Sequence, residues 1–126
     1  MADLVSIALD TLYRTSPTAI PSWSTDSWPV QTINAAHGET HRVYVPNLTQ
    51  ITRSFSHYAT IEHFAIFNLH ATSRAEISWQ DTSAHLNTQI LRPRRLMVIP
   101  DLNPSTNLVL HGIDAVTPML YLIAGT

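Results

Sequence analysis

Residues 62–70 read EHFAIFNLH, and this stretch carries the clearest information about the fold. In an extended strand, alternate side chains point to opposite faces. Both faces are apolar here, with Phe64 and Ile66 on one and Ala65, Phe67 and Leu69 on the other. The stretch therefore predicts a central strand that is covered on both sides. Residues 74–81, RAEISWQD, alternate instead, and we expect Ala75, Ile77 and Trp79 to face the core.

The rest of the chain repeats short strand-like runs that are separated by turn residues. Further strands are expected at residues 30–34, 42–45, 86–91, 95–99, 106–111 and 119–124. About eight strands, with no long helical pattern between them, predict an all-β fold, an antiparallel sandwich or barrel. Only three glycines are present, so tight two-residue hairpins should be few. Longer Greek-key crossings, as in an eight-stranded jelly roll, are therefore expected.

The first residues differ in character from the rest. We expect an N-terminal arm or loop over residues 1–29 and a β-sandwich body over residues 30–126. Residues 15–29, TSPTAIPSWSTDSWP, contain three prolines, which should prevent a regular element from running through them. Residues 2–13, ADLVSIALDTLY, fit both helical and strand spacing, and the pattern leaves both open.

Apolar residues of this arm have no obvious partner inside a closed sandwich. Leu4, Ile7 and Leu9 stand in its first part, and Trp23 and Trp28 stand in its proline-rich part. The two tryptophans either tuck under the arm into the core or anchor the arm to another chain. All five are candidate interface residues, because a soluble monomer rarely exposes a contiguous apolar patch.

The composition argues against several functional classes. The chain has no cysteine, so disulfides and thiolate metal sites are excluded. Its net charge of −2 argues against nucleic-acid binding, which requires a basic field. Charged residues make up only 13%, and serine and threonine number 26, which suits a protein that packs against other subunits. No basic leader or membrane-spanning apolar run is visible, so we expect no membrane contact and synthesis in a cytoplasm.

One basic cluster, RPRR at residues 92–95, stands in an expected turn. A guanidinium fork matches the geometry of a carboxylate and suits desolvated pairing. We therefore expect Arg92, Arg94 and Arg95 to face carboxylates of a protein partner.

HGETH at residues 37–41 raises the question of a metal site. The zinc pattern HExxH places two histidines on one helix face with the glutamate beside the metal. Here the glutamate is displaced, and Gly38 disfavours a helix. On a strand, His37 and His41 would share a face but lie about 13 Å apart, too far for one ion. We expect a turn that leads into the following strand, and no metal.

The seven histidines also invite comparison with cupins, but the cupin signature His-x-His is missing. A composite site of His37, His41 and His111 is geometrically possible. No nucleophile elbow, glycine-rich phosphate loop or paired carboxylates are visible. We therefore expect no catalytic residues and no cofactor.

A sugar-binding platform is a further possibility, because aromatic faces stack on sugar rings. Trp79, Tyr121 and Tyr44 could contribute to one. Trp79 falls on the apolar side of its strand, so core packing is the expectation for it.

The layout of the whole chain resembles the small β-sandwich proteins that decorate or cement the heads of tailed bacteriophages. The arm with proline and tryptophan, the strand-rich body and the apolar final stretch LYLIAGT, residues 120–126, carry the resemblance. It implies a homo-oligomeric, non-enzymatic structural protein on the capsid surface of a virion. Its partner would be the major capsid protein or another virion protein. A carbohydrate-binding or tail-fibre receptor-binding module is the alternative, followed by a cupin-like metal protein.

Overall fold

The computed structural model describes residues 3–7, 12–13, 22–23, 31–35 and 37–126. These residues form strands and no helix, which confirms the predicted all-β fold. The N-terminal strands are β1 (Asp3–Ile7), β2 (Leu12–Tyr13), β3 (Ser22–Trp23) and β4 (Gln31–Ala35). The strands that follow are β5 (His37–Val45), β6 (Ile51–Ser54), β7 (Ile61–Asn68), β8 (Ala75–Gln80), β9 (Leu86–Leu91), β10 (Leu96–Val98), β11 (Asn107–Gly112) and β12 (Thr117–Gly125).

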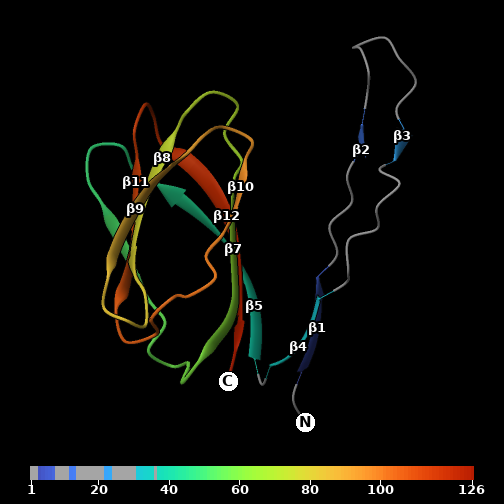
Figure 1. The fold of residues 1–126 in the computed structure, drawn as a ribbon. Helices are drawn as coiled ribbons and strands as arrows, with labels where there is room; N and C mark the ends of the chain where they lie inside the picture. The colour runs from blue at the N-terminus through green and yellow to red at the C-terminus, as the bar shows by residue number, and fades with distance from the viewer. Residues whose placement is uncertain (1–2, 8–11, 14–21, 24–30, 36) are drawn as a thin grey trace.

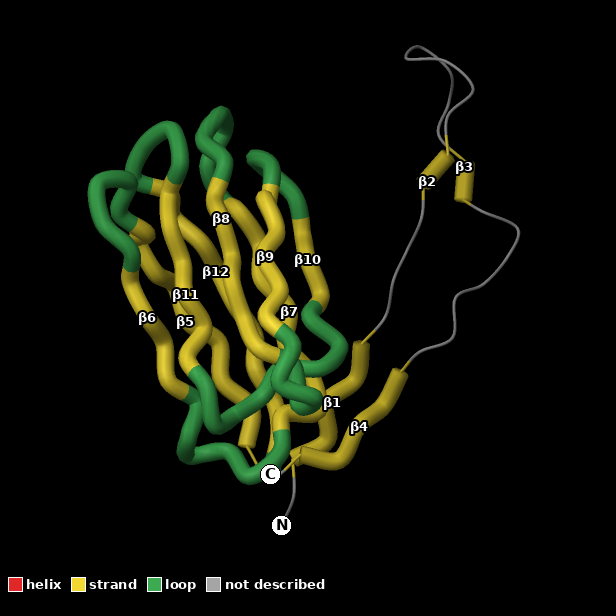
Figure 2. The backbone as a smooth tube through the Cα atoms, turned by 60° about the vertical axis from the view of Figure 1, so that its left-hand side comes forward, coloured by secondary structure: helices red, strands yellow, loops and turns green. Residues whose placement is uncertain are grey.

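Strands β5 to β12 form two four-stranded antiparallel sheets that face each other as a sandwich (Figures 1 and 2). The first sheet has the order β10-β7-β12-β5, and the second has the order β6-β11-β8-β9. The pairing is nested: β5 pairs with β12, β6 with β11, β7 with β10, and β8 with β9. Of these strands, only β8 and β9 are both consecutive in sequence and paired. Every other connection crosses between the sheets, as the low glycine content predicts.

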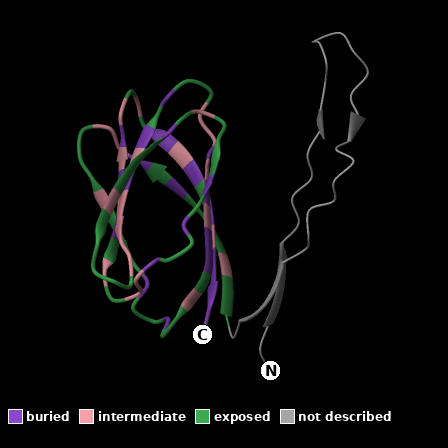
Figure 3. Ribbon diagram, in the orientation of Figure 1, coloured by how far each residue is buried: buried purple, intermediate pink, exposed green. Residues whose placement is uncertain are grey.

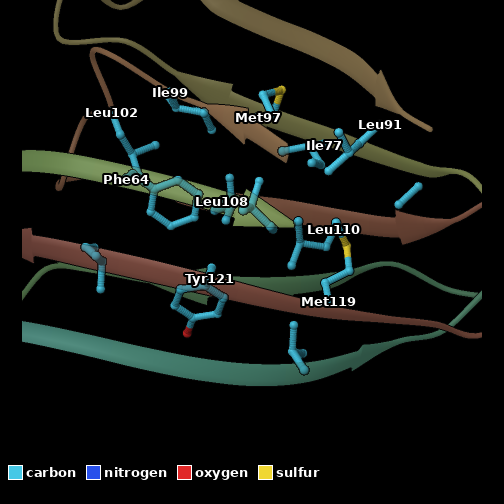
Figure 4. Packing of buried hydrophobic residues seen from close by; sticks show 14 of the residues in the cluster. Phe64, Ile77, Leu91, Met97, Ile99, Leu102, Leu108, Leu110, Met119 and Tyr121 are labelled. Carbon is cyan, nitrogen blue, oxygen red and sulfur yellow. The ribbon is translucent and has the colours of Figure 1, made fainter. Parts of the chain in front are cut away.

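The core lies between the two sheets, where side chains from the facing strands meet (Figure 4). Figure 3 marks the buried residues along the ribbon. The first sheet contributes Phe64 and Ile66 from β7, and Met119, Tyr121 and Ile123 from β12. The second sheet contributes Ala75, Ile77, Leu108 and Leu110. All these side chains are buried, and each large one contributes about 1.5–3 kcal/mol of transfer free energy to folding.

The expectation that β7 is covered on both sides is wrong. Phe64 and Ile66 are fully buried, whereas Ala65, Phe67 and Leu69 on the opposite side are only half-buried. The second sheet covers one face of the first, and no described strand covers the other face along its length. Trp79 lies on the core side of β8, as predicted, but it is only partly buried where it packs against the core.

The outer face of the first sheet is apolar across β10, β7 and β12, whereas β5 presents Arg42 and Thr40 opposite Leu120 and Leu122. Cross-strand register places its side chains in two rows, one with Leu96, Phe67 and Leu120 and one with Val98, Ala65 and Leu122. Tyr44, which is 63% exposed, continues this face on β5. We call these seven residues the outer-face patch.

The outer face of the second sheet is different, because polar side chains interrupt its apolar residues. Leu86 and Ile90 are exposed on β9, but each stands opposite a polar residue, Gln80 and Glu76 respectively. Between them, Ser78 and Thr88 share a hydrogen bond of 3.0 Å. An apolar surface that is continuous across three adjacent strands is therefore found on the first sheet and not on the second.

The N-terminal strands pair with one another and not with either four-stranded sheet. β1 pairs with β4, and β2 pairs with β3, both antiparallel. Residues 3–7 are therefore strand, one of the two conformations that the sequence left open. The strand expected at residues 30–34 exists as β4, but β1 is its partner. The proline-rich stretch, through which no regular element was expected to run, contains only the two-residue strand β3 among its described residues.

The expected turn at residues 37–41 is wrong, because β5 begins at His37. Its register with β12 is continuous from the pair His37 and Gly125 to the pair Val45 and Thr117. Gly38 is a weak strand former, but it stands opposite Ala124 within this long ladder. The ladder outweighs the local preference. Strand β6 was not expected either, since Ile51 is its only apolar residue.

A buried polar residue closes the end of the sandwich where β7 ends. The amide Nδ2 of Asn68 donates to the carbonyl oxygens of Ser73, at 2.8 Å, and of Leu91, at 3.2 Å. Its Oδ1 accepts from the backbone N–H of His70 at 2.9 Å. Asn68 is fully buried, so these bonds tie the β7–β8 connection to the end of β9 without contact with solvent.

Candidate functional site

A polar cleft of about 310 Å³ opens between β5 and β6, which are edge strands of the two sheets. Alternation along β5 puts Glu39 and His41 on the core side, opposite Ile123 and Tyr121 of β12. Arg53 lies on the core side of β6, opposite Leu108. Charged and polar side chains thus occupy inward positions at this edge of the sandwich, where they remain open to solvent.

Glu39 is the centre of the cleft. Its Oε2 lies 2.9 Å from Nε2 of His41, and its Oε1 lies 3.5 Å from Nε2 of His57. Because an ionised carboxylate can only accept, His41 donates this hydrogen bond. The hydrogen bond from His41 lowers the pKa of Glu39, and the positive charge of a protonated His57 lowers it further. An ionised Glu39 therefore orients two imidazole rings that are each about half exposed.

Two arginines and two hydroxyl residues complete the polar lining. They are Arg42, Arg53, Thr52 and Ser54. The guanidinium carbon of Arg42 lies 5.6 Å from the centre of the Tyr44 ring, so Arg42 also borders the outer-face patch. Arg53 makes no ion pair with any residue that the structure describes. Alternation places Arg42, opposite Leu120, on the outer side of β5. Apart from the two histidines, the charged side chains on the core side of the cleft are therefore Glu39 and Arg53.

Aromatic rings form the inner wall of the cleft. Phe55 and Tyr121 line it, and the ring of His41 lies 5.2 Å from that of Tyr121. Figure 4 shows the hydroxyl of Tyr121 pointing away from the apolar cluster, toward β5. Burial raises the pKa of Tyr121, while the charge of Arg53 acts in the opposite direction. The hydroxyl therefore stays protonated and can both donate and accept.

Tyr58 supports the same region from behind. Its ring lies 4.4 Å from that of His57 and 6.2 Å from that of His37. Its hydroxyl is buried, and no hydrogen-bond partner for it exists among the described residues. Burial and the negative charge of Glu39 raise the pKa of Tyr58. The ring packs beside His57, and the hydroxyl lies near Glu39 without a hydrogen bond of normal geometry to it.

The apolar interface residues predicted in the N-terminal part of the chain are only partly described. Leu4 and Ile7 belong to β1 and Trp23 to β3, where the backbone alone is described. Leu9 and Trp28 lie outside the described residues.

The three arginines expected to face a partner are described. Arg92, Arg94 and Arg95 are exposed in the turn between β9 and β10, and Arg94 adopts a positive φ of 56°. They form no ion pair within the described part of the chain.

The composite histidine site does not form. His111 lies 3.1 Å from the carbonyl oxygen of Asn47, beyond the C-terminal end of β5, whereas His37 and His41 occupy the other half of that strand. Across residues 37–126 and the short described strands before them, no group of three or more His, Cys, Asp or Glu side chains could hold a metal ion.

The proposed sugar-stacking trio does not share a surface either. Tyr121 faces the core side of the first sheet, Tyr44 faces its outer side, and Trp79 belongs to the second sheet. The aromatic platform that the sequence left possible is therefore not formed by these three residues.

Sequence reasoning missed the cleft itself. One signal was present, because alternation along HGETH places His37, Glu39 and His41 on one face once the segment is recognised as a strand. His57 and Arg53 carry no such signal, since only the pairing of β6 with β11 brings them to this edge.

In the part of the chain that the structure covers, no helix has the length and apolar character required to cross a membrane. Comparisons of the chain with protein families, with curated proteins and with solved structures give no match.

Proposed function

We propose that this chain is a non-catalytic assembly protein that binds other protein subunits through the outer-face patch, as a decoration or cement subunit of a virus capsid. Its partners are then the major capsid protein or another virion protein, and further copies of itself. The observation that carries the proposal is the patch, in which Leu96, Val98 and Leu120 are 57%, 50% and 37% exposed.

The physical reason is the cost of leaving such a surface in water. Single exposed apolar residues are common, but contiguous apolar surface usually marks an interaction site. The two rows of the patch cross three adjacent strands without a polar interruption. Burying them against a partner would release about 25 cal/mol per Å² of apolar area before the costs of association.

The arginine turn supports a protein partner. Arg95 directly precedes Leu96, and backbone hydrogen bonds join Arg94 and Arg95 to Asn68 at the end of β7, so this turn lies beside one end of the patch. Protein interfaces commonly combine an apolar centre with a polar rim, and arginine is enriched in them. Carboxylates on the partner would pair with this rim.

The strand order is compatible with the proposal. We infer that the nested pairing of β5 to β12 is that of a jelly roll, in which a long antiparallel ribbon folds over on itself. Jelly rolls occur in viral capsid proteins, in lectins and in cupins, so topology by itself does not choose among these functions. The outer-face patch favours assembly over the other two.

Binding to capsid shells tests the proposal. Leu120→Arg places a charge in the patch, and Ile90→Arg places the same charge on the second sheet, at a residue of similar exposure, 42% against 37%. In co-sedimentation with shells of the virus that encodes the chain, Leu120→Arg should bind at least tenfold more weakly than wild type, whereas Ile90→Arg should bind normally. Equal binding by all three proteins, with both variants folded, contradicts the proposal.

A further inference from the structure

We propose that the cleft between β5 and β6 binds a single acidic sugar residue, such as a uronic acid or a sialic acid at the end of a glycan. The carboxylate of the sugar pairs with Arg53, and its hydroxyl groups bind Glu39 and the surrounding hydroxyl side chains. This site is independent of the outer-face patch and of the assembly function proposed above.

Charge identifies the acidic part of the ligand. The only carboxylate in the lining, Glu39, is already contacted by His41 and His57. Arg53 has no such partner among the described residues, and it stands on the core side of its strand. A guanidinium group in this position can bind a carboxylate through two parallel hydrogen bonds.

The remaining polar groups identify a polyhydroxylated ligand. A sugar hydroxyl both donates and accepts, so its site needs acceptors beside donors. Glu39 accepts, the exposed ring edges of His41 and His57 offer further polar atoms, and the hydroxyl of Tyr121 can both donate and accept. The hydroxyl of Ser54 donates to that of Ser56 at 3.3 Å and can still accept. A simple anion would use the arginine and make no contact with the acceptors.

Rigidity and size limit the ligand further. Glu39 and the neighbouring tyrosine rings hold the two imidazoles in place, with ring distances of 5.2 Å for His41 to Tyr121 and 4.4 Å for His57 to Tyr58. Side chains that are ordered before binding lose little entropy on contact. A volume of about 310 Å³ is at the lower end of the range of ligand pockets, roughly 300–1,000 Å³. The cleft therefore suits one sugar residue and not an extended oligosaccharide.

Titration followed by nuclear magnetic resonance tests this inference with the intact chain. Glucuronic acid and N-acetylneuraminic acid are the acidic probes, glucose is the neutral control, and acetate and phosphate are the simple-anion controls. We expect at least one acidic sugar to shift the backbone resonances of Glu39, His41, Arg53 and His57. Glucose, acetate and phosphate should bind at least tenfold more weakly.

Variants assign the contacts. Arg53→Gln should weaken acidic-sugar binding at least tenfold. Arg74→Gln is the matched control, because it removes the same charge from the turn after β7, where Arg74 pairs with Asp114. This control should leave acidic-sugar binding unchanged. Leu120→Arg should also leave it unchanged, which separates this result from the test of assembly. Any of four results overturns the inference. The first is that neither acidic sugar shifts these resonances. The others are that glucose binds as tightly as the acidic sugars, that acetate or phosphate does so, or that Arg53→Gln binds the acidic sugar as tightly as wild type.

Discussion

Phe64 and Phe67 stand three residues apart on β7 but face opposite sides of the first sheet, so truncating each separates the core from the outer-face patch. Phe64 is fully buried, and its ring lies 5.6 Å from that of Tyr121 and 5.7 Å from that of Phe55. Phe64→Ala loses the whole transfer free energy of the ring and leaves a cavity between the two packed sheets. We therefore expect the free energy of unfolding to fall by about 3–5 kcal/mol. Phe67 is half-buried, and water can fill the space left by Phe67→Ala. We expect a loss of about 1 kcal/mol there, part of the transfer free energy alone.

Urea unfolding of the wild type and both variants, followed by circular dichroism, measures this difference. Dilute protein should be used, because association stabilises the folded state in a concentration-dependent way. Phe67→Ala should weaken binding to other subunits although it barely changes the stability of the fold. Phe64→Ala should lower the stability strongly and, when the variant remains folded, leave binding to other subunits unchanged. Free energies of unfolding that fall equally in the two variants would refute the assignment of the faces.

Three further predictions concern polar groups. Asn68→Ala removes three hydrogen bonds of a buried side chain and should lower the free energy of unfolding by about 2–4 kcal/mol. Asn87→Ala loses one exposed hydrogen bond to a backbone carbonyl and should change the free energy little, and equal thermal midpoints of the two variants would contradict this. The side chain of Arg74, together with its backbone N–H, lowers the pKa of Asp114 from 3.8 to about 2. The ionised Asp114 therefore contributes to stability above pH 3.8, and this contribution is lost as the pH falls toward 2. Arg74→Ala keeps the backbone donor, so the Asp114 titration observed by nuclear magnetic resonance should rise only part of the way to 3.8, and an unchanged titration would count against the pair. Tyr58→Phe removes a buried hydroxyl without a visible partner and should leave the melting temperature equal or higher, while a clear decrease would reveal a partner for that hydroxyl.

Sequence alone predicted the parts of the fold that depend on local alternation. The strands β7 and β8 follow directly from apolar residues at every second position, and β9 to β12 from short runs between turn residues. The sequence could not predict β6, because its exposed positions carry no apolar alternation and its pairing with β11 defines it. It also could not predict that one face of β7 remains half exposed. A strand that is apolar on both faces has the same sequence pattern whether a second layer of the same chain or a partner protein covers it.

The cleft was harder to predict than the fold. Gly38 suggested a turn, and the strand there exists because β12 pairs with it along its whole length. Glu39, Arg53 and His57 are separated in sequence, and they meet at one edge only through the crossing of the chain between sheets. Local patterns do not contain that information.

The mass of the purified chain in solution tests most directly whether the outer-face patch mediates assembly. Light scattering after size exclusion, over a range of concentrations, should give a discrete multiple of 14.1 kDa for the wild type and for Ile90→Arg. The same measurement should give a monomer for Leu120→Arg. A mass of 14.1 kDa for all three proteins at every concentration, or one common oligomer for all three, would contradict self-association through the patch.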